Sequence, residues 1–294
     1  MRDSSHAEDF REQGYAIFRG LFDAAEMAEI QDAARAVYAE GVAHPSSYRH
    51  KNLYFEVIDD PDGGHVMLQA HWFSWIDATL ERYRRHPKVF EVLQPLLGGD
   101  IKQIANQIHW KPPGARLTGF RFHQDLRFRD KDSLDGDPFA NSVTLGLAID
   151  RTTAANGALQ VVPGSHKRGY LGLSDDGGAL MKGQTAEGEL RKAGLDPASI
   201  VTCELEPGDA VLWSLLTVHG SGANRSEHDR AFNINSYVRA AASTRGELTF
   251  QGGRSIPLGE EPVLCKYDGL YTNPGPFHTA NDWYKDAPEE TRAG

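Results

Sequence analysis

The second half of the chain has the pattern that most restricts its fold. From Ile101 onward, short β-like runs are separated by glycine and proline, as in IKQIANQIHWKPPG (101–114), NSVTLGLAIDR (141–151) and RAFNINSYVRA (230–240). Several short strands at nearly regular spacing, with turn residues between them, are typical of an antiparallel sandwich or jelly roll. We therefore expect a mainly β fold with some α structure: a cupin-like jelly roll, or double-stranded β-helix, supported by helices that precede it.

Those helices are expected in the first 100 residues. The pattern predicts a short helix that ends at Gly14, a strand in YAIFRGLF (15–22), and a longer helix that begins after Asp23 and stops at Gly41. A loop is predicted over 43–65, followed by a helical block over 75–100 that breaks at Pro87.

One domain is expected for residues 1–294, since neither a repeat nor a low-complexity linker interrupts the chain. Its parts would be a helix-rich region at 1–100, a jelly-roll core at about 101–240, and C-terminal loops at 241–294.

Charge and hydropathy argue against two classes of partner. The net charge is −10 and no run of basic residues is present, so nucleic acid is not an expected partner. The longest nearly apolar run, AVLWSLLTV at 210–218, is too short to cross a bilayer. The polar N-terminus and only two cysteines, expected as free thiols, favour a cytoplasmic protein. Nothing in the sequence indicates an oligomeric state.

The stretch GFRFHQDLRFRD (119–130) carries the first chemical signal. In an extended strand, positions i and i+2 lie on the same face, so His123 and Asp125 would converge on one point. That point could be a metal, a proton-transfer site or only a local ion pair. Taken alone, the pair would more often be a hydrogen-bonded part of the core.

Later residues make a metal the better interpretation. His219 ends a second β-like run, and two histidines with one carboxylate form the facial triad of non-heme Fe(II). Three coordination positions then stay open for a bidentate cosubstrate and O2. Arg230 offers a cation with fork geometry for the far carboxylate of 2-oxoglutarate, and Ser221 offers a second hydrogen bond. Arg225 is a rival for the same role.

The full pattern KPPG…FHQD…NGALQVVPGSHK…PGDAVLW…HGSGANRS…R, over about residues 104–239, resembles the phytanoyl-CoA dioxygenase (PhyH) family of Fe(II)/2-oxoglutarate oxygenases. The resemblance implies that His123, Asp125 and His219 hold the iron and that Arg230 and Ser221 bind 2-oxoglutarate. It also suggests Gln107 and Asn141 as further cosubstrate contacts.

The implied reaction is hydroxylation of an unactivated C–H bond in a small molecule, with release of succinate and CO2. Family halogenases replace the ligand carboxylate with a small residue, so Asp125 favours hydroxylation. Desaturation or epimerisation in the same family remains an alternative. A non-catalytic cupin-like protein that binds a metal or small molecule is the alternative from another class.

Arginines around the metal stretch suggest an anionic substrate. In a regular strand, Arg121 and Arg127 face the same side as His123, where either arginine could clamp a carboxylate or phosphate. A β-bulge would break this parity, and pairing with nearby aspartates is the competing interpretation. Trp213 is expected either to line the substrate cavity or to fill the core.

Overall fold

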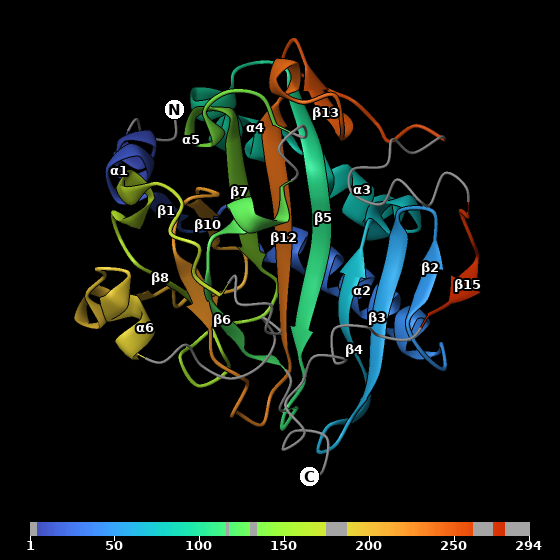
Figure 1. The fold of residues 1–294 in the computed structure, drawn as a ribbon. Helices are drawn as coiled ribbons and strands as arrows, with labels where there is room; N and C mark the ends of the chain where they lie inside the picture. The colour runs from blue at the N-terminus through green and yellow to red at the C-terminus, as the bar shows by residue number, and fades with distance from the viewer. Residues whose placement is uncertain (1–4, 116–117, 130–133, 175–186, 261–272, 280–294) are drawn as a thin grey trace.

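Two antiparallel sheets form the body of the molecule. The computed structural model describes residues 5–115, 118–129, 134–174, 187–260 and 273–279. In this part of the chain, an 11-stranded sheet and a four-stranded sheet enclose a cavity that residues of both sheets line. Figure 1 shows the long strands β5 and β12 at the centre of the larger sheet. The predicted jelly-roll fold is confirmed.

The larger sheet has the order β1-β10-β7-β12-β5-β4-β3-β2-β15, and β13 and β14 branch from β5. Its strands are β1 (Tyr15–Phe18), β10 (Ala210–Trp213), β7 (Ser142–Ala148), β12 (Arg230–Arg239), β5 (Ile101–Lys111), β4 (Gly64–His71), β3 (Leu53–Asp60), β2 (Tyr48–His50), β15 (Phe277–His278), β13 (Glu247–Gln251) and β14 (Arg254–Ser255). The smaller sheet contains β6 (Phe120–His123), β11 (His219–Ser221), β8 (Leu159–Val161) and β9 (Val201–Thr202).

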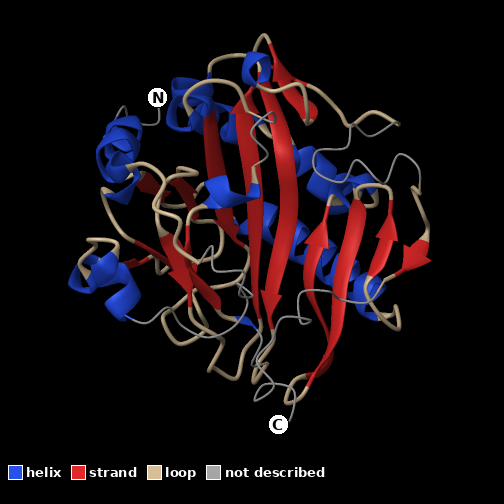
Figure 2. Ribbon diagram, in the orientation of Figure 1, coloured by secondary structure: helices blue, strands red, loops and turns tan. Residues whose placement is uncertain are grey.

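In the view of Figure 2, the longest helix passes behind the larger sheet, and other helices lie at the left and the top of the molecule. The α-helices are α1 (Ser5–Gln13), α2 (Ala24–Val42), α3 (Ala78–Arg84), α4 (Pro87–Leu97), α5 (Pro138–Asn141) and α6 (Glu187–Lys192). Short 3-10 turns are η1 (Phe73–Trp75), η3 (Asp125–Phe128), η4 (Ser165–Arg168), η5 (Pro197–Ser199) and η6 (Ala240–Ala242). Among the helices that the structure describes, none combines the length and apolar character that a bilayer crossing requires.

The predicted start of the long helix is confirmed in detail. Asp23 caps α2 by accepting hydrogen bonds from the N–H groups of Ala25 and Glu26, and the Glu26 side chain accepts from the Asp23 N–H. This reciprocal capping box satisfies donors that the first helical turn leaves free. Apolar residues of α2, such as Ile30 and Val37, belong to the same buried core as Phe55 and Met67 of the sheet.

The predicted helix stop at Gly41 is wrong, because α2 continues to Val42. Gly41 serves packing instead. A Cβ atom at this position would lie 2.1 Å from the sulfur of Met67 in β4, so any larger residue would force the buried Met67 side chain to move.

Two predicted loop regions contain strands. Residues 43–65 include β2, β3 and the first residues of β4, which extend the large sheet beyond β5. The segment DDPDGG at 59–64 is therefore a turn between two strands, not the end of a loop. Residues 241–294 likewise include β13, β14 and β15. The N-terminal extension matters for function because β4 pairs directly with β5, placing Gln69 opposite His109 and His71 opposite Gln107.

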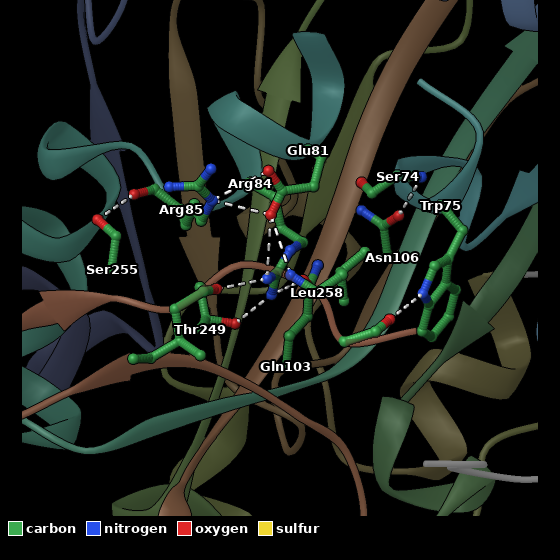
Figure 3. A network of polar contacts seen from close by, with 12 residues as sticks. Ser74, Trp75, Glu81, Arg84, Arg85, Gln103, Asn106, Thr249, Ser255 and Leu258 are labelled. Carbon is green, nitrogen blue, oxygen red and sulfur yellow. Dashed lines mark hydrogen bonds and ion pairs between the residues drawn. The ribbon is translucent and has the colours of Figure 1, made fainter. Parts of the chain in front are cut away.

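A buried arginine ties the segment at 255–259 to the helices (Figure 3). Arg84 donates to the hydroxyl of Thr249 at 2.7 Å and to the carbonyl of Ile256 at 2.9 Å, and its side chain has no exposed surface. Nearby, Trp75 donates its indole N–H to the carbonyl of Gly259 at 3.1 Å. The segment is therefore held by side chains from η1 and α3.

We predict that Arg84→Ala lowers the free energy of unfolding by about 3 kcal/mol, because it removes several buried hydrogen bonds from a charged donor. The neighbouring Arg85→Ala is a matched control. Arg85 bonds Glu81 at 2.8 Å from a partly exposed position, so its loss should cost less than about 1 kcal/mol. Chemical denaturation of both variants measures the difference. Equal costs would show that burial of Arg84 contributes nothing extra.

Candidate metal and cosubstrate site

Three potential metal ligands meet where two strands of the smaller sheet pair. His123 ends β6, His219 begins β11, and the two residues are paired in register. Asp125 follows at the start of η3. The Asp125 Oδ1 atom lies 3.5 Å from Nε2 of His123 and 3.4 Å from Nε2 of His219. One potential ligand atom from each residue lies within 4.8 Å of the others, so the three side chains could hold one metal ion.

Backbone carbonyls fix the orientation of both imidazoles. Nδ1 of His123 lies 2.7 Å from the carbonyl oxygen of Arg121, and Nδ1 of His219 lies 2.9 Å from that of Thr217. Each Nδ1 must donate to a carbonyl oxygen, which leaves a lone pair on Nε2 when the ring is neutral. Both lone pairs then point toward a carboxylate. That arrangement is repulsive unless a cation lies between them, so the donor set fits a metal ion.

The pKa shifts of Asp125 and His123 agree with this interpretation. Burial acts to raise the pKa of Asp125, but the imidazoles of His219 and His123 outweigh it and hold that pKa well below its usual range. Burial, with the nearby His219, lowers the pKa of His123. Burial acts to lower the pKa of His219, but the nearby carboxylate of Asp125 outweighs it and raises that pKa. Asp125 is therefore ionised and His123 neutral at neutral pH, which are the states that ligate metals.

Trp213 positions the carboxylate. Its indole N–H donates to Oδ2 of Asp125 at 3.0 Å, while Oδ1 faces the two histidines. The indole therefore fixes which oxygen points toward the metal position. Outer-shell hydrogen bonds of this kind orient metal ligands.

A pair of buried basic side chains, called the cation pair below, lines the same cavity. Arg230 of β12 and Lys111 of β5 are opposite each other in the pairing of these strands. Arg230 is only 3% exposed, and its Nη2 donates to the carbonyl of Gly157. Its Nε is buried and has no hydrogen-bond partner among the described residues. This orphaned donor beside a cavity fits an anionic group that is not part of the protein.

Lys111 donates to Ser221 Oγ at 2.7 Å, to the carbonyl of Gly222 at 2.6 Å and to that of Gly157 at 3.3 Å. Three acceptors match the three N–H bonds of an ammonium group. Because Ser221 accepts from Lys111, its own hydroxyl proton is left to donate elsewhere. Burial lowers the pKa of Arg230 to about 10, and burial with the nearby Arg230 holds that of Lys111 well below its usual range. A bound anion would stabilise the charged forms of both side chains and so raise both pKa values again.

The cavity that joins the metal ligands to the cation pair has a volume of about 180 Å³. Both sheets and the segment that follows β4 line it. Besides the metal ligands and the cation pair, its lining includes Asn52, Gln69, His71, Trp72, Asn106, Gln107, His109, Phe120, Phe128, Arg129, Leu159, Trp213, Ser221, Phe232, Ile234 and Ser236.

Of the further residues predicted from sequence, Ser221, Gln107 and Trp213 line this cavity. Asn141 does not. It lies in α5, where its Nδ2 donates to the carbonyl of Asp135 at 2.8 Å and its Oδ1 accepts from Arg239. The predicted cosubstrate contact of Asn141 is therefore corrected: a polar residue just before β7 is used to stabilise a loop.

The two arginines predicted to meet the substrate are also absent from the cavity lining. Arg121 forms an ion pair with Glu189 at 3.6 Å, and Arg127 donates to the carbonyl of Ser174 at 2.7 Å. The cause is irregular backbone. The pairing of β6 with β11 shifts register between His123 and Phe120, and strand geometry ends before Asp125. The regular alternation of side chains between the two faces of the strand is therefore lost on both sides of His123. Phe120 and Arg129 line the cavity instead of Arg121 and Arg127.

Arg225, the rival of Arg230 for the cosubstrate carboxylate, lines a separate and smaller pocket. Two further polar residues of the core also lie outside the lining of the main cavity. His166 is buried beside α1, where its Nε2 lies 3.1 Å from the carbonyl oxygen of Arg11. Tyr237 is fully buried in the core.

Sequence reasoning missed Lys111, His109, Gln69 and His71. For two of them a signal was present. In the strand QIHWK, alternate residues share a face, so a predicted cavity-facing Gln107 also places His109 and Lys111 in the cavity. Gln69 and His71 were missed because β4 was not recognised.

Comparison with known proteins agrees with the fold and the site. A family model described as "Phytanoyl-CoA dioxygenase (PhyH)" matches residues 10–232. A probable alpha-ketoglutarate-dependent hypophosphite dioxygenase of Stutzerimonas stutzeri is 28% identical over 243 residues, which cover 80% of this chain and 78% of the relative. An ectoine dioxygenase of Sphingopyxis alaskensis is 27% identical over 255 residues, covering 83% and 78%.

Solved structures show the same fold. EctD from S. alaskensis, with bound Fe, superposes with a TM-score of 0.64 at 20% identity and covers 90% of this chain and 86% of that one. The epimerase SnoN, in complex with Fe3+, alpha ketoglutarate and nogalamycin RO, gives a TM-score of 0.59 at 21% identity, covering 88% and 94%.

Fold, donor set and relatives together define an Fe(II)- and 2-oxoglutarate-dependent dioxygenase. The match over most of the length is decisive for the family: the chain belongs to the phytanoyl-CoA dioxygenase (PhyH) family. Fe(II) is its metal, and 2-oxoglutarate and O2 are its cosubstrates.

Proposed function

We propose that this protein hydroxylates an unactivated C–H bond of a small molecule, with Fe(II) bound by His123, Asp125 and His219. In the reaction, one oxygen atom of O2 enters the substrate and the other enters succinate, while the 2-oxo acid loses CO2. Iron supplies this redox chemistry when bound. The protein's own residues hold the metal on one face, leave the opposite face open to the cavity, and exclude bulk water.

The buried cation pair is the observation that carries this proposal. A protein that only stored a metal would have no use for Arg230 and Lys111 in a closed space beside the ligands. The far carboxylate of 2-oxoglutarate would take a bidentate contact with Arg230, including its orphaned Nε, and a hydrogen bond from the Ser221 hydroxyl. The same contacts argue against the non-catalytic binding protein.

Anaerobic spectroscopy tests the metal assignment. We predict that the Fe(II) protein with 2-oxoglutarate shows the weak visible charge-transfer band of a chelated 2-oxo acid, and that His219→Ala lacks it. A site with two protein ligands neither holds nor orients iron well. His166→Ala is the control, since that histidine lies outside the cavity lining. An unchanged band and near-normal iron content in His219→Ala would rule out the triad.

The cosubstrate assignment predicts a separate phenotype. Arg230→Ala should weaken 2-oxoglutarate binding by roughly 2 to 5 kcal/mol, the usual cost of truncating one partner of a buried charge pair. Iron content should stay near normal because Arg230 is not a ligand. Arg225→Ala, in the separate pocket, should bind 2-oxoglutarate normally. Titration of the charge-transfer band measures both variants, and the reverse pattern would identify Arg225 as the anchor.

Charge in the cavity favours an anionic substrate. Among the described lining residues, the cations Lys111, Arg129 and Arg230 accompany one carboxylate, Asp125. The charges of Fe(II) and of 2-oxoglutarate cancel each other, so cationic side chains still outnumber carboxylates among the described lining residues, even with Lys111 neutral. Hypophosphite, for which one relative is named, is itself an oxyanion. We infer that Arg129, rather than Arg121 or Arg127, meets the anionic group.

We predict that Arg129→Ala raises the KM for an anionic substrate by about 10- to 100-fold, since a hydrogen bond to a charged group contributes about 1.5 to 3 kcal/mol. Poorer orientation should also increase succinate release that is not coupled to product. The KM for 2-oxoglutarate should not change. Arg121→Ala and Arg127→Ala are controls that should leave coupling intact, and a substrate without charge would contradict the assignment.

A further inference from the structure

A chain of four polar side chains crosses the cavity wall formed by β4 and β5. Nε2 of His109 lies 3.0 Å from Oε1 of Gln107, Nε2 of Gln107 lies 3.4 Å from Nδ1 of His71, and Nε2 of His71 lies 2.9 Å from Oε1 of Gln69. All four residues line the cavity. We call this row the His109–Gln69 chain. The proposed binding of the metal and of 2-oxoglutarate gives this chain no role.

The chain has a direction, because an amide oxygen only accepts and an amide nitrogen only donates. His109 must donate from Nε2 to Gln107, Gln107 donates to Nδ1 of His71, and His71 donates from Nε2 to Gln69. These bonds are all satisfied with both imidazoles neutral. They leave a lone pair on Nδ1 of His109, for which the described part of the protein supplies no donor.

His109 is held in this neutral form and in this orientation. Burial, with the nearby cations Arg230 and Lys111, lowers the pKa of His109 to about 3. Its ring stacks on Phe120, with ring centroids 5.4 Å apart and an interplanar angle of 25°. Nδ1 therefore remains an acceptor near neutral pH.

Strand pairing places this acceptor next to the cation pair on one face of the larger sheet. Along β5, cavity-facing residues alternate as Lys111, His109 and Gln107. Across the sheet, His109 is paired with Phe232 and Gln107 with Ile234. The cavity wall formed by this sheet is thus polar along β4 and β5, and the apolar Phe232 and Ile234 of β12 lie beside it. A substrate that lies over this face of the sheet would present a polar edge to His109 and carbon atoms to the neighbouring Phe232.

We propose that the His109–Gln69 chain is a substrate-binding subsite that selects a hydroxylated small molecule, whose O–H donates to Nδ1 of His109. A group that only accepts hydrogen bonds would place its lone pair against that of Nδ1. An ammonium donor is disfavoured because Lys111 and Arg230 are close. The proposal rests on the proposed function and adds that the anionic substrate carries a hydroxyl group before oxidation.

The tautomer of His109 provides a test that needs neither substrate nor turnover. The protein with Zn(II) and 2-oxoglutarate, labelled with 15N-histidine, is examined by long-range 1H–15N NMR between about pH 6 and 8, near the ordinary histidine pKa. His109→Gln assigns the signal by its disappearance. We expect a neutral ring protonated at Nε2 throughout. A ring protonated at Nδ1, or one that titrates in this range, overturns the proposal.

Ligand pairs test the selection itself. The probes are short hydroxy acids, each compared with its deoxy and its O-methyl analogue, added to the anaerobic protein with Fe(II) and 2-oxoglutarate. Perturbation of the charge-transfer band gives the Kd. We expect some hydroxy acids to bind about tenfold more tightly than either analogue, the effect of one hydrogen bond to a fixed acceptor. Equal affinities within the pairs, tighter binding of the O-methyl forms, or no binding by any hydroxy acid would each overturn the proposal.

Two isosteric variants separate recognition from structure. His109→Asn can place an amide oxygen near the Nδ1 position and should keep the preference for the hydroxyl. His109→Gln places its amide near the Nε2 position and should reduce the ratio of affinities toward one. Both should keep normal 2-oxoglutarate affinity. A loss of 2-oxoglutarate affinity would assign His109 to the cosubstrate, whereas absence of the band in the wild-type protein would contradict the proposed function instead.

Discussion

Strand β5 is the element on which the rest of the molecule depends. It pairs with β12 on one side and with β4 on the other, and so joins the jelly-roll core to the N-terminal extension. Its alternate residues face the cavity, where Lys111 lies opposite Arg230 and His109 lies opposite Gln69. One strand therefore contributes to the cation pair and to the polar wall, and its register sets the distance between them.

The proposed metal site depends on hydrogen bonds that orient its three side chains. The backbone carbonyls of Arg121 and Thr217 orient the rings of His123 and His219. Because each carbonyl belongs to the strand or turn that carries the histidine, ring direction follows from local backbone. Asp125 is instead oriented at long range, by the indole of Trp213. The geometry of the proposed metal site thus depends both on the smaller sheet and on β10 of the larger one.

Much of this arrangement could be predicted from sequence, and the failures have specific causes. Glycine and proline spacing predicted the jelly roll, and the spacing of His123, Asp125 and His219 predicted the donor set. Which side chains around His123 face the cavity could not be predicted, because a register shift in β6 and a 3-10 turn replace regular strand geometry. The extension was missed because charged turn residues interrupt its apolar runs, so pairing with β5 decides its structure.

The extension has a consequence for how such a protein can change. Asn52, Gln69, His71 and Trp72 come from β2–β4 and the turn that follows, whereas the metal ligands and the cation pair come from residues 111–230. One part of the cavity lining is therefore encoded in a stretch of the chain that is separate from the proposed metal ligands. Replacement of residues 48–72 by recombination would change this part of the cavity lining and leave the three proposed metal ligands in place.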